Sequence, residues 1–157
     1  MNHKRTGRGR ASTAAGTSSL VLIVGSFVGD ESAWDQILGP YRGEEKRVQS
    51  GREALTLLQN SSVRVVICER DLPDGTWRDM LESMAGLNEP PALIVASRLA
   101  DDHLWLEVLN AGGYDVLARP FDRQEANRTI ALAHRLGSHR GPRGIAAERS
   151  LPTCLRI

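Results

Sequence analysis

Cysteine is scarce in this chain, because only two of its 157 residues are cysteines. Cys68 lies in an apolar stretch and Cys154 in a polar end segment, so the sequence predicts neither a disulfide framework nor a cysteine metal site. Long apolar runs are lacking too, since the run 20–24 is too short for a secretory signal or a membrane span. These absences argue against export and membrane insertion, and we expect a protein of the reducing cytoplasm.

A strong excess of one charge is also lacking, since the formal net charge is +1. The distribution is nevertheless uneven: residues 1–18 carry a net charge of +4, residues 19–137 of −6 and residues 138–157 of +3. No aromatic residue stands between the arginines of the ends to stack on bases. We therefore expect 19–137 to form a single domain and both ends to be disordered basic segments, with nucleic-acid binding by them as the less favoured alternative.

The body of the chain alternates strand-length segments with helical patterns. The expected strands are 20–24, 46–48, 63–68, 92–96 and 114–118. The helices that follow them are expected to start near Asp30, Gly51, Trp77, Asp101 or Asp102, and Asp122. This alternation predicts an α/β protein with a five-stranded parallel sheet, doubly wound by helices on both faces.

The segment 65–75 is the most informative part of the chain. An apolar strand ends on Glu69 and runs into a turn formed by Pro73, Asp74 and Gly75. Together with 51–55 and 109–121, this segment resembles the receiver (CheY-like) domains of response regulators, over a stretch from about residue 20 to about residue 136. The resemblance implies the flavodoxin-like receiver fold and a place in two-component (phosphorelay) signal transduction.

The same resemblance implies a changed phosphorylation site. Glu69 stands where the family has its phosphoacceptor aspartate, and Gly25 and Ser26 stand where the family has the acidic pair that holds Mg²⁺. Ser97 keeps the family's hydroxyl, and Arg119 replaces its lysine. A glycine and a serine cannot replace two carboxylate ligands, so we expect no metal site, no cofactor, no catalytic residue and no enzymatic activity.

Two interpretations of Glu69 and Arg119 remain open at this point. In the first, an ion pair between them holds the domain in one state, as a pseudo-receiver with a degenerate phosphoacceptor; in the second, the pair is only structural. A receiver that still responds to phosphorylation or to a pocket ligand is the alternative within the family. A displaced acidic site using Asp71, Asp74 or Asp30 with Glu31 is disfavoured, because Asp74 suits a turn and Asp30 a helix cap.

The family also implies a surface for partners. Receiver domains use helix four, strand five and helix five, which here points to Leu104, Trp105, Tyr114 and Val116. Val116 replaces an aromatic switch residue of the family, and Tyr114, two residues earlier, is expected on the same face. The expected partner is a histidine kinase or an output protein, with a homodimer as a further option; Ser97 is expected to be only a polar residue at a strand end.

An FMN-binding flavodoxin-like protein is the rival from another class, because it shares the sheet order and binds phosphate after strand one. Here that loop is 25–31. It lacks a dense cradle of serine, threonine and glycine, and the carboxylates of Asp30 and Glu31 would repel a phosphate.

Overall fold

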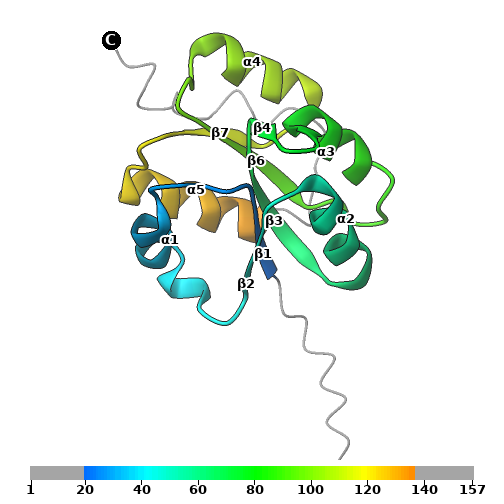
Figure 1. Cartoon of the computed structure of the whole chain (residues 1–157), viewed down its shortest axis with the longest axis horizontal. Coiled ribbons are helices and arrows are strands. Elements are labelled where there is room, and N and C mark those ends of the chain that lie inside the picture. Colours follow the sequence, from blue (N-terminus) through cyan, green and yellow to red (C-terminus); the bar gives the residue numbers. More distant parts are fainter. Residues whose placement is uncertain (1–19, 137–157) are drawn as a thin grey trace, which may run out of the picture.

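The computed structural model describes residues 20–136, in which strands and helices alternate (Figure 1). The elements are β1 (Leu20–Val24), α1 (Glu31–Ile37), the 3₁₀ helix η1 (Gly39–Tyr41), β2 (Glu45–Val48), α2 (Gly51–Asn60), β3 (Val63–Glu69), β4 (Asp71–Leu72), β5 (Gly75–Thr76), α3 (Trp77–Met84), β6 (Ala92–Ser97), α4 (Asp102–Ala111), β7 (Asp115–Ala118) and α5 (Arg123–Leu136). The predicted basic ends, 1–18 and 138–157, and Cys154 lie outside the described residues.

The main sheet has five strands in the order β2-β1-β3-β6-β7, and every neighbouring pair is parallel. Helices α1 and α5 cover one face, and α2, α3 and α4 cover the other. The predicted α/β class and five-stranded parallel sheet are confirmed. The structure adds two features that were not predicted, the 3₁₀ helix η1 and a two-stranded antiparallel hairpin of β4 and β5 between β3 and α3.

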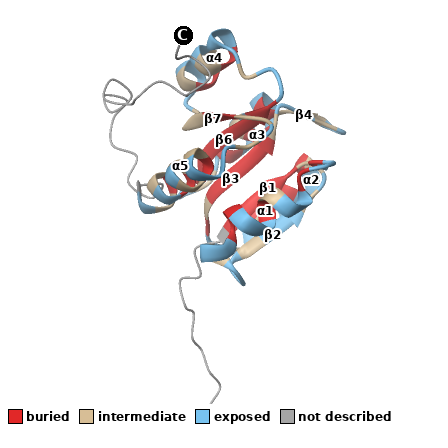
Figure 2. Cartoon of the chain, turned by 90° about the vertical axis from the view of Figure 1, so that its left-hand side faces the viewer, coloured by how far each residue is buried: buried red, intermediate tan, exposed pale blue. Residues whose placement is uncertain are grey.

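The central strands are buried on both faces, which is why they read as continuous apolar runs rather than alternating ones. In β3, the residues from Val65 to Cys68 have no solvent exposure, and Figure 2 shows the buried interior of the sheet between the helical layers. Successive side chains divide between two cores. Val65 and Ile67 face α1 and α5, whereas Val66 and Cys68 face α2, α3 and α4.

Helices α4 and α5 begin at aspartates whose side chains cap them. The Asp101 carboxylate accepts a hydrogen bond from the Leu104 N–H at 2.9 Å, so Asp101 rather than Asp102 caps α4. Gly112 ends this helix in the left-handed region with a φ of +103°. Asp122 accepts from the Glu125 N–H at 2.8 Å at the start of α5, as expected. Among residues 20–136, no helix combines the length and apolar character needed to cross a membrane.

Candidate functional site at the carboxyl edge of the sheet

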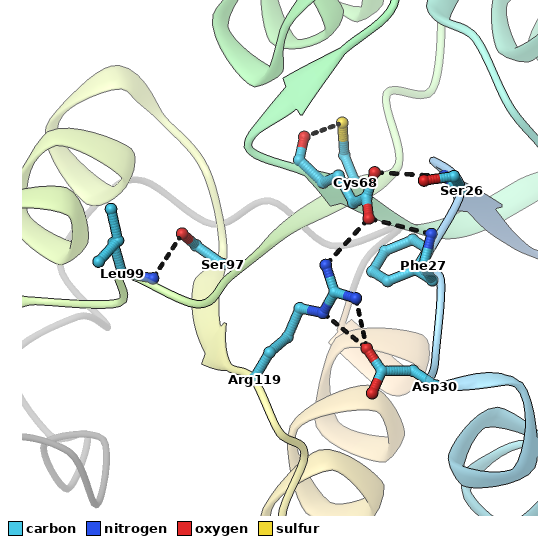
Figure 3. A network of polar contacts seen from close by, with 8 residues as sticks. Ser26, Phe27, Asp30, Cys68, Ser97, Leu99 and Arg119 are labelled. Carbon is cyan, nitrogen blue, oxygen red and sulfur yellow. Dashed lines mark hydrogen bonds and ion pairs between the residues drawn. The ribbon is translucent and has the colours of Figure 1, made fainter.

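Parallel strands bring their carboxyl ends to one edge of the sheet, and four of the predicted pocket residues meet there. Gly25 follows β1 directly, Glu69 ends β3, Ser97 ends β6 and Arg119 follows β7. Residues up to 94 positions apart in the sequence are thereby placed at one edge of the sheet, where Figure 3 shows the polar contacts made by Ser26, Phe27, Asp30 and Arg119.

The Glu69 carboxylate is held by three donors. Its Oε2 accepts a hydrogen bond from the Ser26 backbone N–H at 3.2 Å, and its Oε1 accepts from the Phe27 N–H at 3.0 Å. Oε1 also accepts from Arg119 Nη1 at 3.0 Å. The side chain is 14% exposed: the bond from Ser26 is open to solvent, whereas the charge-assisted bonds from Phe27 and Arg119 are partly buried.

Arg119 joins Glu69 to a second carboxylate, that of Asp30. Its Nε donates to Asp30 Oδ2 at 2.7 Å, and Nη2 contacts the same oxygen (Figure 3). The exposed fraction of the side chain is 9% for Arg119 and 11% for Asp30. A planar guanidinium can bridge two carboxylates in this way, whereas the single ammonium of lysine offers no such fork.

Asp30 occupies the N-cap position of α1, as expected, but its side chain does not cap the helix. The side chain of Asp30 makes no capping hydrogen bond, because its carboxylate turns into the pocket toward Arg119, 89 residues further along the chain. The sequence disfavoured a role for Asp30 in the site, because a carboxylate just before a helix is usually a cap. The available clue was its position in the loop after the first strand, which the fold places beside the loop after the fifth.

Gly25 gives the Glu69 carboxylate room to approach the loop. Its φ is +136°, a region that residues with a side chain rarely adopt. A Cβ at this position would lie 2.6 Å from Glu69 Oε2 and 2.7 Å from Glu69 Cδ. A glycine where the family has an acidic residue therefore allows the longer glutamate to reach the backbone N–H groups behind it.

An aromatic cluster packs against the loop that follows β1. Phe27 is the one non-glycine residue of the described chain with a positive φ, of 44°. Its ring packs edge-on against Trp34, with centroids 5.1 Å apart, and Trp34 packs against Phe121 at 4.6 Å. The Arg119 guanidinium lies over the Phe27 ring, 5.1 Å from its centroid. Packing thus fixes the backbone that donates to Glu69.

Ser97 and Cys68 make local contacts. The Ser97 Oγ accepts a hydrogen bond from the Leu99 N–H at 3.0 Å, a turn contact at the end of β6. The thiol of Cys68 donates to the Glu69 carbonyl oxygen at 3.1 Å. Burial, followed by the negative charges of Glu69 and Asp74, raises the pKa of the Cys68 thiol to about 12, which favours the protonated thiol.

The donor set does not suit Mg²⁺, which prefers oxygen ligands in octahedral geometry. Two backbone N–H groups and a guanidinium point at Glu69, and Asp30 is engaged by the same guanidinium. Within residues 20–136, no group of three or more histidine, cysteine, aspartate or glutamate residues is placed to hold a metal ion. The loop N–H groups that an FMN phosphate would need are likewise used by Glu69.

The other acidic candidates lie away from the pocket. Asp71 is exposed, and its carboxylate is 3.9 Å from Arg70. The Asp74 carboxylate accepts hydrogen bonds from the N–H groups of Gly51 at 2.9 Å and Arg52 at 3.0 Å, which lowers its pKa. Asp74 is therefore both a turn residue of the hairpin and a partner of the free N–H groups at the start of α2.

The predicted partner surface needs correction. Leu104 and Val116 are buried in the core between the sheet and α2, α3 and α4, so neither offers its side chain to a partner. Tyr114 packs against the core between the sheet and helices α1 and α5, so it does not share a face with Val116. It precedes β7, and the alternation of side chains between the two faces holds only within a strand. Trp105 is half-buried and its indole N–H donates to Asp115 Oδ1 at 3.3 Å.

Comparison with known proteins places this architecture in one class. No family model matches the chain, and no curated protein matches it in sequence. Solved structures do: the signal receiver domain of a protein described as a Luxo repressor, from Vibrio parahaemolyticus, is 21% identical with a TM-score of 0.68, over 76% of this chain and 92% of that one. A CheY-like receiver domain protein from Methanospirillum hungatei is 20% identical with a TM-score of 0.66, over 78% of this chain and 98% of that one.

A third similar structure comes from a complex. The receiver domain of the response regulator Ssk1 from Saccharomyces cerevisiae, solved together with the histidine phosphotransfer signalling protein Ypd1, is 14% identical with a TM-score of 0.66. The match covers 76% of this chain and 91% of that one. The chain therefore has the fold of response-regulator receiver domains, although at these identities the likeness defines the fold alone.

Proposed function

We propose that this chain is a receiver-type module of two-component signalling, which acts by contact with another signalling protein and has a degenerate phosphoacceptor site. The receiver fold supports the first part of the proposal. The single observation that carries the second is the Glu69 carboxylate at the end of β3, where the resemblance puts the acceptor aspartate: both of its oxygens are engaged by hydrogen-bond donors.

Phosphoryl transfer to Glu69 would be slow for two physical reasons. A carboxylate oxygen that attacks phosphorus would weaken the bonds from its donors, which here include the charge-assisted bond from Arg119 in a partly buried site. The phosphoryl group would also arrive without a metal to neutralise its charge, and catalysis of this reaction consists mainly of positioning and charge stabilisation. We therefore propose that the module works without phosphorylation, Mg²⁺ or an enzymatic step.

The same contacts favour a single conformational state. Separation of Glu69 from Arg119 would leave ionised groups in a largely buried site, which costs about 3 kcal/mol or more. A state without this ion pair would then be populated at about one part in a hundred or less. Such a domain stays in one conformation, and its partner binds a surface that does not change.

A titration tests the pocket directly. The purified protein is titrated with Mg²⁺ and then with beryllofluoride, a phosphoryl mimic, while tryptophan fluorescence and amide NMR shifts are followed. Trp34 contacts Phe27 in the pocket wall and would report a rearrangement there. The proposal predicts no saturable change, whereas saturable shifts around Ser26, Ser97 and Arg119 would contradict it and favour a receiver regulated by phosphorylation or a pocket ligand.

Partner binding tests the signalling role. Histidine kinases, phosphotransfer proteins and output proteins from the same organism are purified and titrated against the full chain by calorimetry. We expect one of them to bind with an affinity that a phosphodonor leaves unchanged, and Glu69→Ala to weaken it. A failure of all of them to bind would overturn the signalling proposal. If Glu69→Ala binds as tightly as the wild-type protein, the ion pair of Glu69 is not needed for partner binding. Sedimentation of the chain alone tests for a homodimer.

A further inference from the structure

We propose that the loop 25–30, between β1 and α1, is an anion-binding cradle that accepts one carboxylate group, and that Glu69 is its built-in ligand. At this place the family has acidic residues that bind a cation. This chain has backbone hydrogen-bond donors there instead, and such donors bind an anion. This inference deepens the proposed function and rests on it, because the Glu69 carboxylate then occupies the site that an external anionic regulator would otherwise occupy. The chemistry of the cradle can be tested without any partner.

The donors form a two-pronged arrangement. The N–H groups of Ser26 and Phe27 are consecutive in the chain, and each bonds a different oxygen of the same carboxylate, at 3.2 and 3.0 Å. Consecutive N–H groups that converge in this way are a known means of binding anions. The positive φ of Phe27, which is unfavourable for a residue with a side chain, accompanies this geometry. These donors lie in the loop before α1 and not at the end of a helix.

The charges around the cradle select a monoanion. Arg119 supplies a third donor to the carboxylate, but its positive charge is shared with Asp30, which is buried and contacts the same guanidinium. Arg119 and Asp30 together carry no net charge, so the ligand meets hydrogen-bond donors rather than an excess of positive charge. A phosphate dianion would also be repelled by Asp30, and a singly charged carboxylate is therefore preferred.

Truncation of Glu69 creates a matching vacancy. Glu69→Ala removes one methylene and one carboxylate, which are the heavy atoms of an acetate ion, and leaves the Ser26 and Phe27 N–H groups and Arg119 in place. Glu69→Gln is the matched control, because it fills the same space with a neutral amide and leaves no room for acetate. Wild-type protein is the second control, since its own carboxylate occupies the donors.

The experiment is chemical rescue by acetate. Thermal unfolding and the amide shifts of Ser26 and Phe27 are measured in Glu69→Ala during titration with sodium acetate, with sodium chloride and sodium phosphate at the same ionic strength as references. We expect saturable shifts of both amides and a rise in Tm of about 5 °C at ten times the Kd, with acetate alone. Wild type and Glu69→Gln should show neither effect.

Several outcomes would overturn the cradle. These are a folded Glu69→Ala protein that responds to acetate no more than to chloride, an equal response of Glu69→Gln, or a stronger response to phosphate than to acetate. If Glu69→Ala does not fold, the Ser26 and Phe27 amides of wild type and Glu69→Gln are compared: loss of charge at position 69 must shift both, and unchanged amides would refute the cradle. Failure of acetate rescue would contradict the cradle but not the proposed signalling role. A response of the wild-type protein to beryllofluoride would contradict the degenerate phosphoacceptor site and leave the test of the cradle unaffected.

Discussion

Gly25→Ala should be among the most destabilising substitutions near the pocket, and its cost should depend on Glu69. The φ of +136° imposes backbone strain on alanine, which costs about 1–3 kcal/mol. The new Cβ would also lie 2.6 Å from Glu69 Oε2, so the carboxylate must leave its N–H donors. Hydrogen bonds to a charged group contribute about 1.5–3 kcal/mol, and the expected total loss in the free energy of unfolding is about 3–5 kcal/mol.

A double-mutant cycle with Glu69→Ala separates the two contributions. Without the glutamate side chain the steric conflict disappears, and Gly25→Ala should then cost only the strain, about 1–3 kcal/mol. The coupling energy between the two positions, measured by urea unfolding of the four proteins, should be about 2 kcal/mol. Gly43→Ala is the control for strain alone, because Gly43 has a φ of +89° and a Cβ added there would meet no other atom within 4 Å. A coupling energy near zero would refute the argument that Gly25 makes room for Glu69.

Neighbouring contacts lead to three further predictions. Arg119→Leu should lower the free energy of unfolding, measured in urea, by about 3 kcal/mol, because the buried Asp30 and the partly buried Glu69 lose their cation. Arg119→Lys should cost less, and equal costs would contradict a role for the charge. The pKa of Asp74 is lowered by its N–H partners, so its stabilisation is present above the ordinary aspartate range and is lost as the pH falls through its folded pKa; the stability difference between wild type and Asp74→Asn should shrink on acidification. In Cys154→Ser protein, Cys68 should react with a thiol reagent at about pH 8 only after unfolding, and rapid labelling of folded protein would refute its burial.

Most of the fold could be predicted from the sequence because its signals are local. The apolar run of β3 and the helical spacing from Trp77 to Met84 each identify an element without knowledge of the rest of the chain. The β4–β5 hairpin was missed, since two-residue strands are too short to carry a periodic pattern. Tyr114 was placed on the wrong face for a related reason: alternation holds only within a strand, and β7 begins one residue later.

The placement of the predicted site residues could be anticipated, but their contacts could not. The resemblance placed Gly25, Ser26, Glu69 and Arg119 at the carboxyl edge of the sheet, and the structure shows all four there. It could not show that the side chain of Ser26 matters less than its backbone N–H, since backbone donors leave no trace in residue identity. Asp30 was assigned to a cap because its actual partner is 89 positions away.

By itself, the sequence determined the α/β class and the five strand-and-helix units. Those properties depend on residue type and spacing, which are local. Only the tertiary structure decided that Arg119 bridges Glu69 and Asp30, and that the loop after β1 turns its N–H groups toward a carboxylate. Such contacts depend on backbone direction and on distances between segments far apart in the chain, which become defined when the parallel strands bring their carboxyl ends to one edge.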